Sequence, residues 1–210
     1  MRQALVAVMA AATLAGCGAR GEVPEPDRSR TRTDWRAVAT VADRERLRRW
    51  RTVWLDAVGR ARASGAASEI AAEGALFDPD RMLDDAVPPA GDYRCRVFKL
   101  GAKSATMRDF VVYPAFTCRI DAEGRASSFY KIGGSQRPVG LIFPNSAGRP
   151  VFLGTLMLGN ETRSIDYGRD STRDMAGFVD RIGERRWRLV LPLPAFESTL
   201  DLIELVPAER

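Results

Sequence analysis

The feature that most restricts the fold is a change in the period of the hydrophobic pattern at Asp92. From this residue onward, apolar and polar residues alternate in short runs rich in Val, Ile, Phe, Tyr and Leu, which turn residues separate. Such runs are typical of antiparallel strands in a sandwich or barrel. We expect eight strands, near residues 92–100, 110–121, 126–133, 138–144, 150–158, 175–182, 185–192 and 199–206. Because closure removes exposed sheet edges, an up-and-down barrel is favoured, with a partly open, strongly curved sheet as the alternative.

Two of the predicted hairpins have a register that the sequence suggests. A loop from Asn145 to Arg149 places Leu141 opposite Leu153. A Gly183-Glu184 turn suits a type II′ hairpin, which needs glycine first. The second turn places Asp180 opposite Trp187 and puts three arginines on the other, solvent-facing side: Arg181, Arg186 and Arg188.

The residues before the strands have a helical period. Thr40 and Asp43 approximate a capping box, and the helix that follows is expected to end near Ser64-Gly65. Its apolar stripe consists of Leu47, Trp50, Trp54, Ala57, Val58 and Ala61. A second, shorter helix is predicted over Ser68–Glu73. We expect the stripe to pack on the sheet, which gives an α+β, mainly β fold; an arginine-rich helix resting on anionic headgroups or cell-wall polymer is the alternative.

The N-terminal residues have the pattern of a bacterial lipoprotein signal peptide. A short apolar run ends in Leu14-Ala15-Gly16-Cys17, the lipobox pattern in which the cysteine thiol takes a diacylglyceryl group. The run is shorter than the roughly 20 residues that a membrane-spanning helix requires. We therefore expect a signal peptide over residues 1–16 and a mature chain anchored to the membrane through Cys17, with an ordinary secretory signal as the alternative.

After Cys17, the chain divides into three segments of different composition. Residues 17–33 are rich in Pro, Gly, Ser and Arg and predict a disordered tether. A helical segment over 34–90 and an antiparallel β domain over 91–210 follow. Gly18 follows Cys17, and no aspartate is present there to act as an inner-membrane retention signal. We therefore expect the protein to be anchored on the periplasmic side of the envelope, in the outer membrane rather than the inner one.

Two further cysteines predict a disulfide. If the first two strands pair where residue numbers sum to 213, Cys95 lies opposite Cys118 on one face of the sheet. In an exported protein this favours a disulfide, which stabilises the fold by about 3 kcal/mol in the chain-entropy model. The alternative is two buried free thiols.

The composition excludes several classes of function. The chain contains no histidine, which removes Ser-His-Asp and Cys-His catalysis and histidine metal ligands. Of its 32 basic residues only Lys99, Lys103 and Lys131 are lysines. This arginine excess is what a GC-rich genome produces, so the net charge of +5 does not indicate a nucleic-acid partner. We predict no cofactor, no bound metal and no catalytic residues.

Two polar clusters lie at predicted strand ends and are candidates for ligand binding. One is the glycine-rich segment from Gly133 to Pro138, and the other precedes the last strand. The candidate residues are Ser135, Gln136, Arg137, Glu197 and Ser198. Glycines in such a segment let the backbone approach a ligand closely, although ordinary turn chemistry explains them equally.

Several long runs resemble a family of small exported bacterial proteins that is known only as a domain of unknown function. The runs are GDYRCRVFKLGAKSA (91–105), GSQRPVGLIFP (134–144), FLGTLMLGNE (152–161), YGRDSTRDMAG (167–177) and RIGERRWRLVLPLPAFESTLDLIELVPA (181–208). The resemblance covers roughly residues 34–208. It implies an exported envelope protein and no particular activity.

Three functions are compatible with these observations. The first is a non-catalytic barrel that binds a small molecule or a lipid, since small closed barrels hold one such ligand. The second is an interaction subunit that binds an envelope protein partner. The third is a hydrolase that uses carboxylates such as Glu197 or Asp180.

Overall fold

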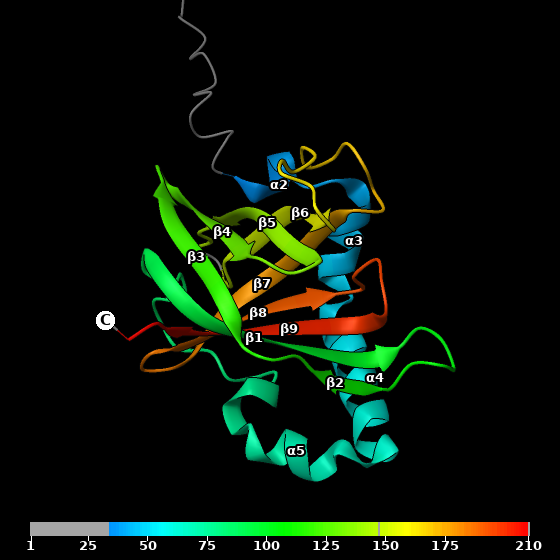
Figure 1. Ribbon diagram of the computed structural model, residues 1–210. Coiled ribbons are helices and arrows are strands. Elements are labelled where there is room, and N and C mark those ends of the chain that lie inside the picture. The colour runs from blue at the N-terminus through cyan, green and yellow to red at the C-terminus, as the bar shows by residue number, and fades with distance from the viewer. Residues whose placement is uncertain (1–33, 147, 210) are drawn as a thin grey trace, which may run out of the picture.

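The computed structural model describes residues 34–146 and 148–209. Within these residues, the sheet has nine strands in the order β2-β1-β3-β4-β5-β6-β7-β8-β9. The last strand also pairs with β1, so β1 and β3 to β9 close into an eight-stranded antiparallel barrel (Figure 1). The strands are β1 (Gly91–Ala102), β2 (Phe110–Val112), β3 (Phe116–Glu123), β4 (Ala126–Ile132), β5 (Gln136–Phe143), β6 (Val151–Leu158), β7 (Asp174–Gly183), β8 (Arg186–Pro192) and β9 (Ser198–Pro207). The predicted closed barrel is confirmed.

One predicted strand, residues 110–121, is in fact two strands. Tyr113-Pro114-Ala115 separates β2 from β3, because proline has no backbone N–H to donate to a ladder. Strand β3 pairs with the first half of β1, and the short β2 pairs with the second half of the same edge.

The helices precede the strands and lie against the outer side of the barrel (Figure 1). They are α2 (Trp35–Val38), α3 (Val41–Arg48), α4 (Trp50–Ala61), a π-helical turn (Arg62–Ala66), α5 (Ala67–Ala72) and a 3₁₀ turn (Gly74–Phe77). The Thr40 hydroxyl caps α3 by accepting from the backbone N–H of Asp43 at 3.1 Å. Gly65, with φ +103°, bends the chain where the sequence predicts the end of the long helix. None of the described helices combines the length and apolar character that a bilayer crossing requires.

The helical stripe packs on outward-facing residues of the barrel, as predicted. Trp54, Ala57, Val58 and Ala61 are buried in a cluster with residues of three neighbouring strands, Phe98, Leu100, Val190, Leu200 and Leu202. Trp50 is only half-buried and meets Trp54 and Phe178 edge to face. A separate cluster that includes Cys95, Phe129, Phe152 and Trp187 fills the barrel interior.

The predicted disulfide is present, but the register used to predict it is wrong. Cys95 and Cys118 are bonded, with 6.0 Å between their Cα atoms. Cys95 lies opposite Phe116, and Cys118 lies opposite Tyr93, so the true register differs by two residues. Because side chains on a strand alternate between faces with a period of two, this shift leaves both cysteines on the inward face, where they meet diagonally.

The register of one later hairpin is confirmed and that of the other is wrong. Leu141 does lie opposite Leu153. Asp180, however, lies opposite Arg188 rather than Trp187, because the turn is at Glu184-Arg185 instead of Gly183-Glu184 and a bulge between Arg181 and Gly183 adds one residue to β7. A slip of one residue exchanges the two faces of a strand. The slip therefore moves Asp180 to the outer face of the barrel, beside Arg188. Arg188 does lie on the face opposite Trp187, as predicted, but it is fully buried rather than in solvent, because the helical segment covers that face.

Candidate ligand-binding site at the mouth of the barrel

A cavity of about 250 Å³ opens at one end of the barrel. The segment between β4 and β5 borders it on one side, and the loop between β8 and β9 borders it on another. Its deeper walls are apolar, because alternate residues of each strand face inward. These wall residues are Val97, Pro138, Leu156, Met175, Leu191 and Ile203.

A charged cluster centred on Lys99 lines the same cavity. The Lys99 ammonium lies 2.9 Å from a carboxylate oxygen of Glu197 and 3.4 Å from one of Asp201. It also donates to the side-chain oxygen of Gln136 at 3.1 Å, and the Gln136 amide in turn donates to Glu197 at 3.1 Å. Lys99 is thus paired with two carboxylates, and its donors are used within the protein.

The two carboxylates beside Lys99 have pKa values displaced in opposite directions. Burial raises the pKa of Asp201, and the positive charge of Lys99 only partly opposes this effect. The hydrogen bond from Lys99 lowers the pKa of the more exposed Glu197, and bonds from Gln136 and Tyr113 add to the effect. For Lys99 itself, burial acts to lower the pKa, but the neighbouring carboxylates outweigh it and the pKa is raised. These directions favour an ionised Glu197 and a charged Lys99.

A second lysine at the cavity, Lys131 at the end of β4, is in a different situation. Its ammonium lies 4.2 Å from the centroid of the Phe116 ring, and among the described residues it has no ion pair and no side-chain hydrogen bond. Burial lowers the pKa of Lys131, and the nearby positive charges of Lys99 and Arg137 lower it further. Lys131 is therefore a lysine at the mouth that no described carboxylate contacts.

The third lysine holds the loop that borders the mouth. Lys103 donates from its ammonium to the backbone carbonyl oxygens of Pro194 and Ala195. Leu193 and Glu197, which flank this loop, have positive φ values of 51° and 66° that non-glycine residues rarely adopt. All three lysines of an arginine-rich chain thus lie at one end of the barrel.

The structure brings together some of the predicted site residues and separates others. Ser135, Gln136 and Glu197 line the cavity. Ser198 is buried behind it, and its hydroxyl donates to Asp201. Arg137 does not line the cavity, because its guanidinium donates to the carbonyl oxygens of Gly134, Gly159 and Glu161.

Sequence reasoning missed Lys99, Lys131 and Asp201 as site residues. One signal could have found the two lysines: a chain that uses arginine almost everywhere keeps lysine at only three positions. Asp201 carries no such signal, since an inward-facing aspartate in an apolar strand is visible only once the barrel is closed.

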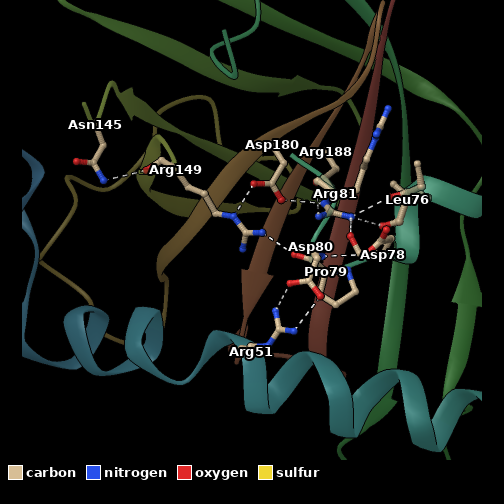
Figure 2. Close-up of polar contacts among 11 residues, drawn as sticks. Arg51, Leu76, Asp78, Pro79, Asp80, Arg81, Asn145, Arg149, Asp180 and Arg188 are labelled. Atoms are coloured by element: carbon tan, nitrogen blue, oxygen red, sulfur yellow. Dashed lines mark hydrogen bonds and ion pairs between the residues drawn. The ribbon is translucent and has the colours of Figure 1, made fainter. Parts of the chain in front are cut away.

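The other carboxylate considered for hydrolysis, Asp180, lies in a different place. It sits on the outer side of the barrel wall under the helical segment, completely buried (Figure 2). Arg188 donates to it from Nε at 2.9 Å, and Arg149 approaches its other oxygen at 2.9 Å. Asp180 and Glu197 therefore do not form one catalytic centre.

Arg188 also holds the backbone of the segment after α5, which lies over it. Figure 2 shows the Arg188 guanidinium surrounded by backbone of the segment after α5. It donates to the carbonyl oxygens of Leu76 at 2.9 Å, Asp78 at 2.7 Å and Arg81 at 3.1 Å, and lies 4.8 Å from the centroid of the Trp54 ring. This buried network attaches the helical segment to the barrel and is structural.

A family model described as a domain of unknown function (DUF4893) matches residues 35–205. No curated protein and no solved structure matches the chain.

Proposed function

The chain belongs to the DUF4893 family, and for this member we propose that the barrel binds a small amphipathic molecule in the cavity at its mouth. The observation that carries the proposal is the cavity itself, with apolar walls inside and charged groups at the rim. Pockets that combine mainly apolar lining with a few convergent polar groups are the usual form of small-molecule sites.

The size of the cavity limits the ligand. Its volume of about 250 Å³ lies just below the roughly 300–1,000 Å³ of sites that take drug-sized ligands. A short aliphatic or single-ring molecule fits this space, with its apolar part against Leu156 and Met175. A complete phospholipid does not.

The charged cluster supports binding over catalysis. Glu197 and Asp201 both lie beside the same lysine, so neither carboxylate is free to attack or to activate a water molecule without first giving up its partner. The chain contains no histidine that could replace them as a base near neutral pH.

A carboxylate-based hydrolase is the second candidate, on one observation. Carboxyl groups whose pKa values are displaced in opposite directions at one cavity form the pattern of an acid and base pair, and Asp201 and Glu197 have it. Hydrolysis of a chromogenic ester or glycoside that the Glu197→Gln variant fails to catalyse would favour this candidate over simple binding.

We propose in addition that the protein is a lipoprotein, anchored through Cys17 on the periplasmic side of the outer membrane. The support is the Leu14-Ala15-Gly16-Cys17 sequence, which lies outside the described residues, as do the predicted signal peptide and tether. A tether over residues 17–33 would hold the barrel away from the bilayer and leave its mouth accessible.

Blocking the cavity tests the proposed binding. Leu156→Trp places a large side chain in the cavity wall, whereas Leu141→Trp adds the same side chain at an exposed position on the neighbouring strand. Purified full chain carrying Cys17→Ala, which has no acyl chains to compete, is titrated with 1-hexanol and studied by heteronuclear NMR. We expect shifts of cavity residues in the parent chain and in Leu141→Trp, and none in Leu156→Trp. Equal shifts in both variants would overturn the proposal.

A further inference from the structure

We infer that the ligand of this cavity is an aliphatic carboxylate, whose charged group pairs with the ammonium of Lys131 while its apolar part lies against the inner walls. This inference rests on the proposed binding function and names the class of ligand. It follows from the ion pairs at the cavity, from the space around Lys131 and from the chemistry of the groups beside it.

The ion pairs at the cavity leave one cation without a carboxylate in contact. Among the described residues, three cationic side chains line the cavity: Lys99, Arg173 and Lys131. Lys99 is paired with Glu197 and Asp201, and Arg173 donates to both oxygens of Glu161 at 2.8 Å. Of these three, only Lys131 has no described carboxylate within ion-pair distance.

The position of Lys131 makes this charge unfavourable in the empty protein. The side chain is half-buried against Phe116, and its charged neighbours Lys99 and Arg137 are cations. A partly buried charge without a partner costs free energy, which an incoming anion would offset. An anionic ligand therefore gains from Lys131 in a way that a neutral ligand of the same shape does not.

The turn beside Lys131 leaves room for the anion. Gly133 and Gly134 both have positive φ, 82° and 81°, in the segment that borders the mouth. A Cβ atom on Gly134 would lie 3.3 Å from the Lys131 nitrogen, so any other residue at this position would crowd the ammonium. Ser135, the next residue, also lines the cavity and supplies a hydroxyl donor.

A carboxylate suits this site better than a phosphate. One unpaired ammonium balances a single negative charge, whereas a phosphate monoester carries about −1.5 to −2 at neutral pH. The ionised Glu197 at the same mouth would repel the additional charge. Phosphate sites commonly supply bidentate arginine donors, and Arg173, the cavity's arginine, is already occupied by Glu161.

The test compares ligands that share a tail and differ in charge. The purified Cys17→Ala chain is titrated with hexanoate, 1-hexanol, hexylammonium and hexyl phosphate. The variants are Lys131→Met, Lys131→Arg and, as the matched control, Arg125→Gln, which removes an exposed cation from the turn at the far end of β4. We expect hexanoate to bind at least about tenfold more tightly than 1-hexanol. Lys131→Met should remove this advantage and leave 1-hexanol binding unchanged, Lys131→Arg should retain part of it, and Arg125→Gln should behave as the parent.

The pH dependence supplies a second readout. Because the pKa of Lys131 lies below its usual value, hexanoate affinity should fall as the pH rises through that pKa, while 1-hexanol affinity stays constant. The same fall should be absent in Lys131→Arg, since arginine keeps its charge.

The outcomes separate the inference from the function on which it rests. If none of the four ligands binds the parent chain, the proposed binding function itself fails. If 1-hexanol binds as tightly as hexanoate, and Lys131→Met changes neither affinity, the cavity binds ligands but the inference of a carboxylate ligand is overturned. Tighter binding of hexyl phosphate or hexylammonium than of hexanoate overturns it as well.

Discussion

Asp180 accepts a hydrogen bond from Nε of Arg188 at 2.9 Å, and both side chains are completely buried between the barrel wall and the helical segment. Arg188 also donates to backbone carbonyl oxygens of residues more than one hundred positions earlier in the chain. The pair therefore joins the two parts of the fold at a point where water is excluded.

Breaking this buried pair should be strongly destabilising. Removing one partner leaves a buried charge without compensation, so we expect Asp180→Asn and Arg188→Gln each to lower the free energy of unfolding by about 3–5 kcal/mol. The double variant should cost clearly less than the sum, since the same interaction is lost only once. Denaturant unfolding monitored by tryptophan fluorescence measures all three.

A matched control for this prediction is the exposed pair Arg51–Asp80, whose side chains are 2.6 Å apart (Figure 2). Solvent screens such a pair, so Arg51→Gln should leave the unfolding midpoint almost unchanged. Equal effects of Arg51→Gln and Arg188→Gln would contradict the structural role of the buried network.

The disulfide should contribute as a single unit. We expect Cys95→Ser and Cys118→Ser to destabilise the fold by comparable amounts, about 3 kcal/mol in the chain-entropy model for a loop of this length, and the double variant to be no worse than either. Thiol counting on the denatured, unreduced protein should detect neither cysteine. Two free thiols at these positions would show that the bond does not form in the cell.

Trp54 should be the most important residue of the long helix. It is 1% exposed and packs on the barrel, whereas Trp50 is only half-buried. We expect Trp54→Ala to cost about 3–5 kcal/mol, as for a buried aromatic residue cut to alanine. Leu55→Ala, at an exposed position next to it, should cost no more than about 0.5 kcal/mol. Thermal melts of the two variants decide whether the helix belongs to the core.

Lys131 should reduce the stability of the empty protein at neutral pH. Its folded-state pKa lies below the usual value, because burial and neighbouring cations disfavour the charged form. The penalty is therefore fully present below the folded pKa and disappears as the pH rises toward the unfolded value near 10.5. We expect Lys131→Met to be more stable than the parent at pH 7, with the difference narrowing as the pH rises. Unfolding free energies measured at several pH values test the sign, and a difference that widens with pH would contradict it.

The lipid anchor predicts a simple biochemical result. Cells that express the natural chain should incorporate labelled palmitate into it, and Cys17→Ala should abolish the label and release the protein from the membrane fraction or leave its signal uncleaved. Cys95→Ser, which removes a cysteine far from the lipobox, is the control and should keep the label. Absence of label in the natural chain would dismiss the lipoprotein proposal.

Much of the fold follows from local patterns in the sequence. The period of two after Asp92 determines the strands, since each must turn one face to an apolar interior. The cap at Thr40 and the bend at Gly65 bound the helices through local backbone chemistry. The loop after Phe143 sets the pairing of Leu141 with Leu153, because no bulge interrupts that hairpin.

Only the tertiary structure determined the features that depend on one extra residue in a strand or on strands that are distant in the sequence. The bulge before Gly183 brings Asp180 to the outer face beside Arg188, the helical segment buries both side chains, and no local pattern in the sequence indicates either outcome. Lys99, Lys131 and Asp201 come from three strands that meet only when β1 pairs with β9 and closes the barrel. The sequence alone determined the alternation and the turns, which are short-range properties of the backbone. Closure of the barrel forms the site. The long-range contacts between strands select the register that places Lys99, Lys131 and Asp201 at one mouth of the barrel.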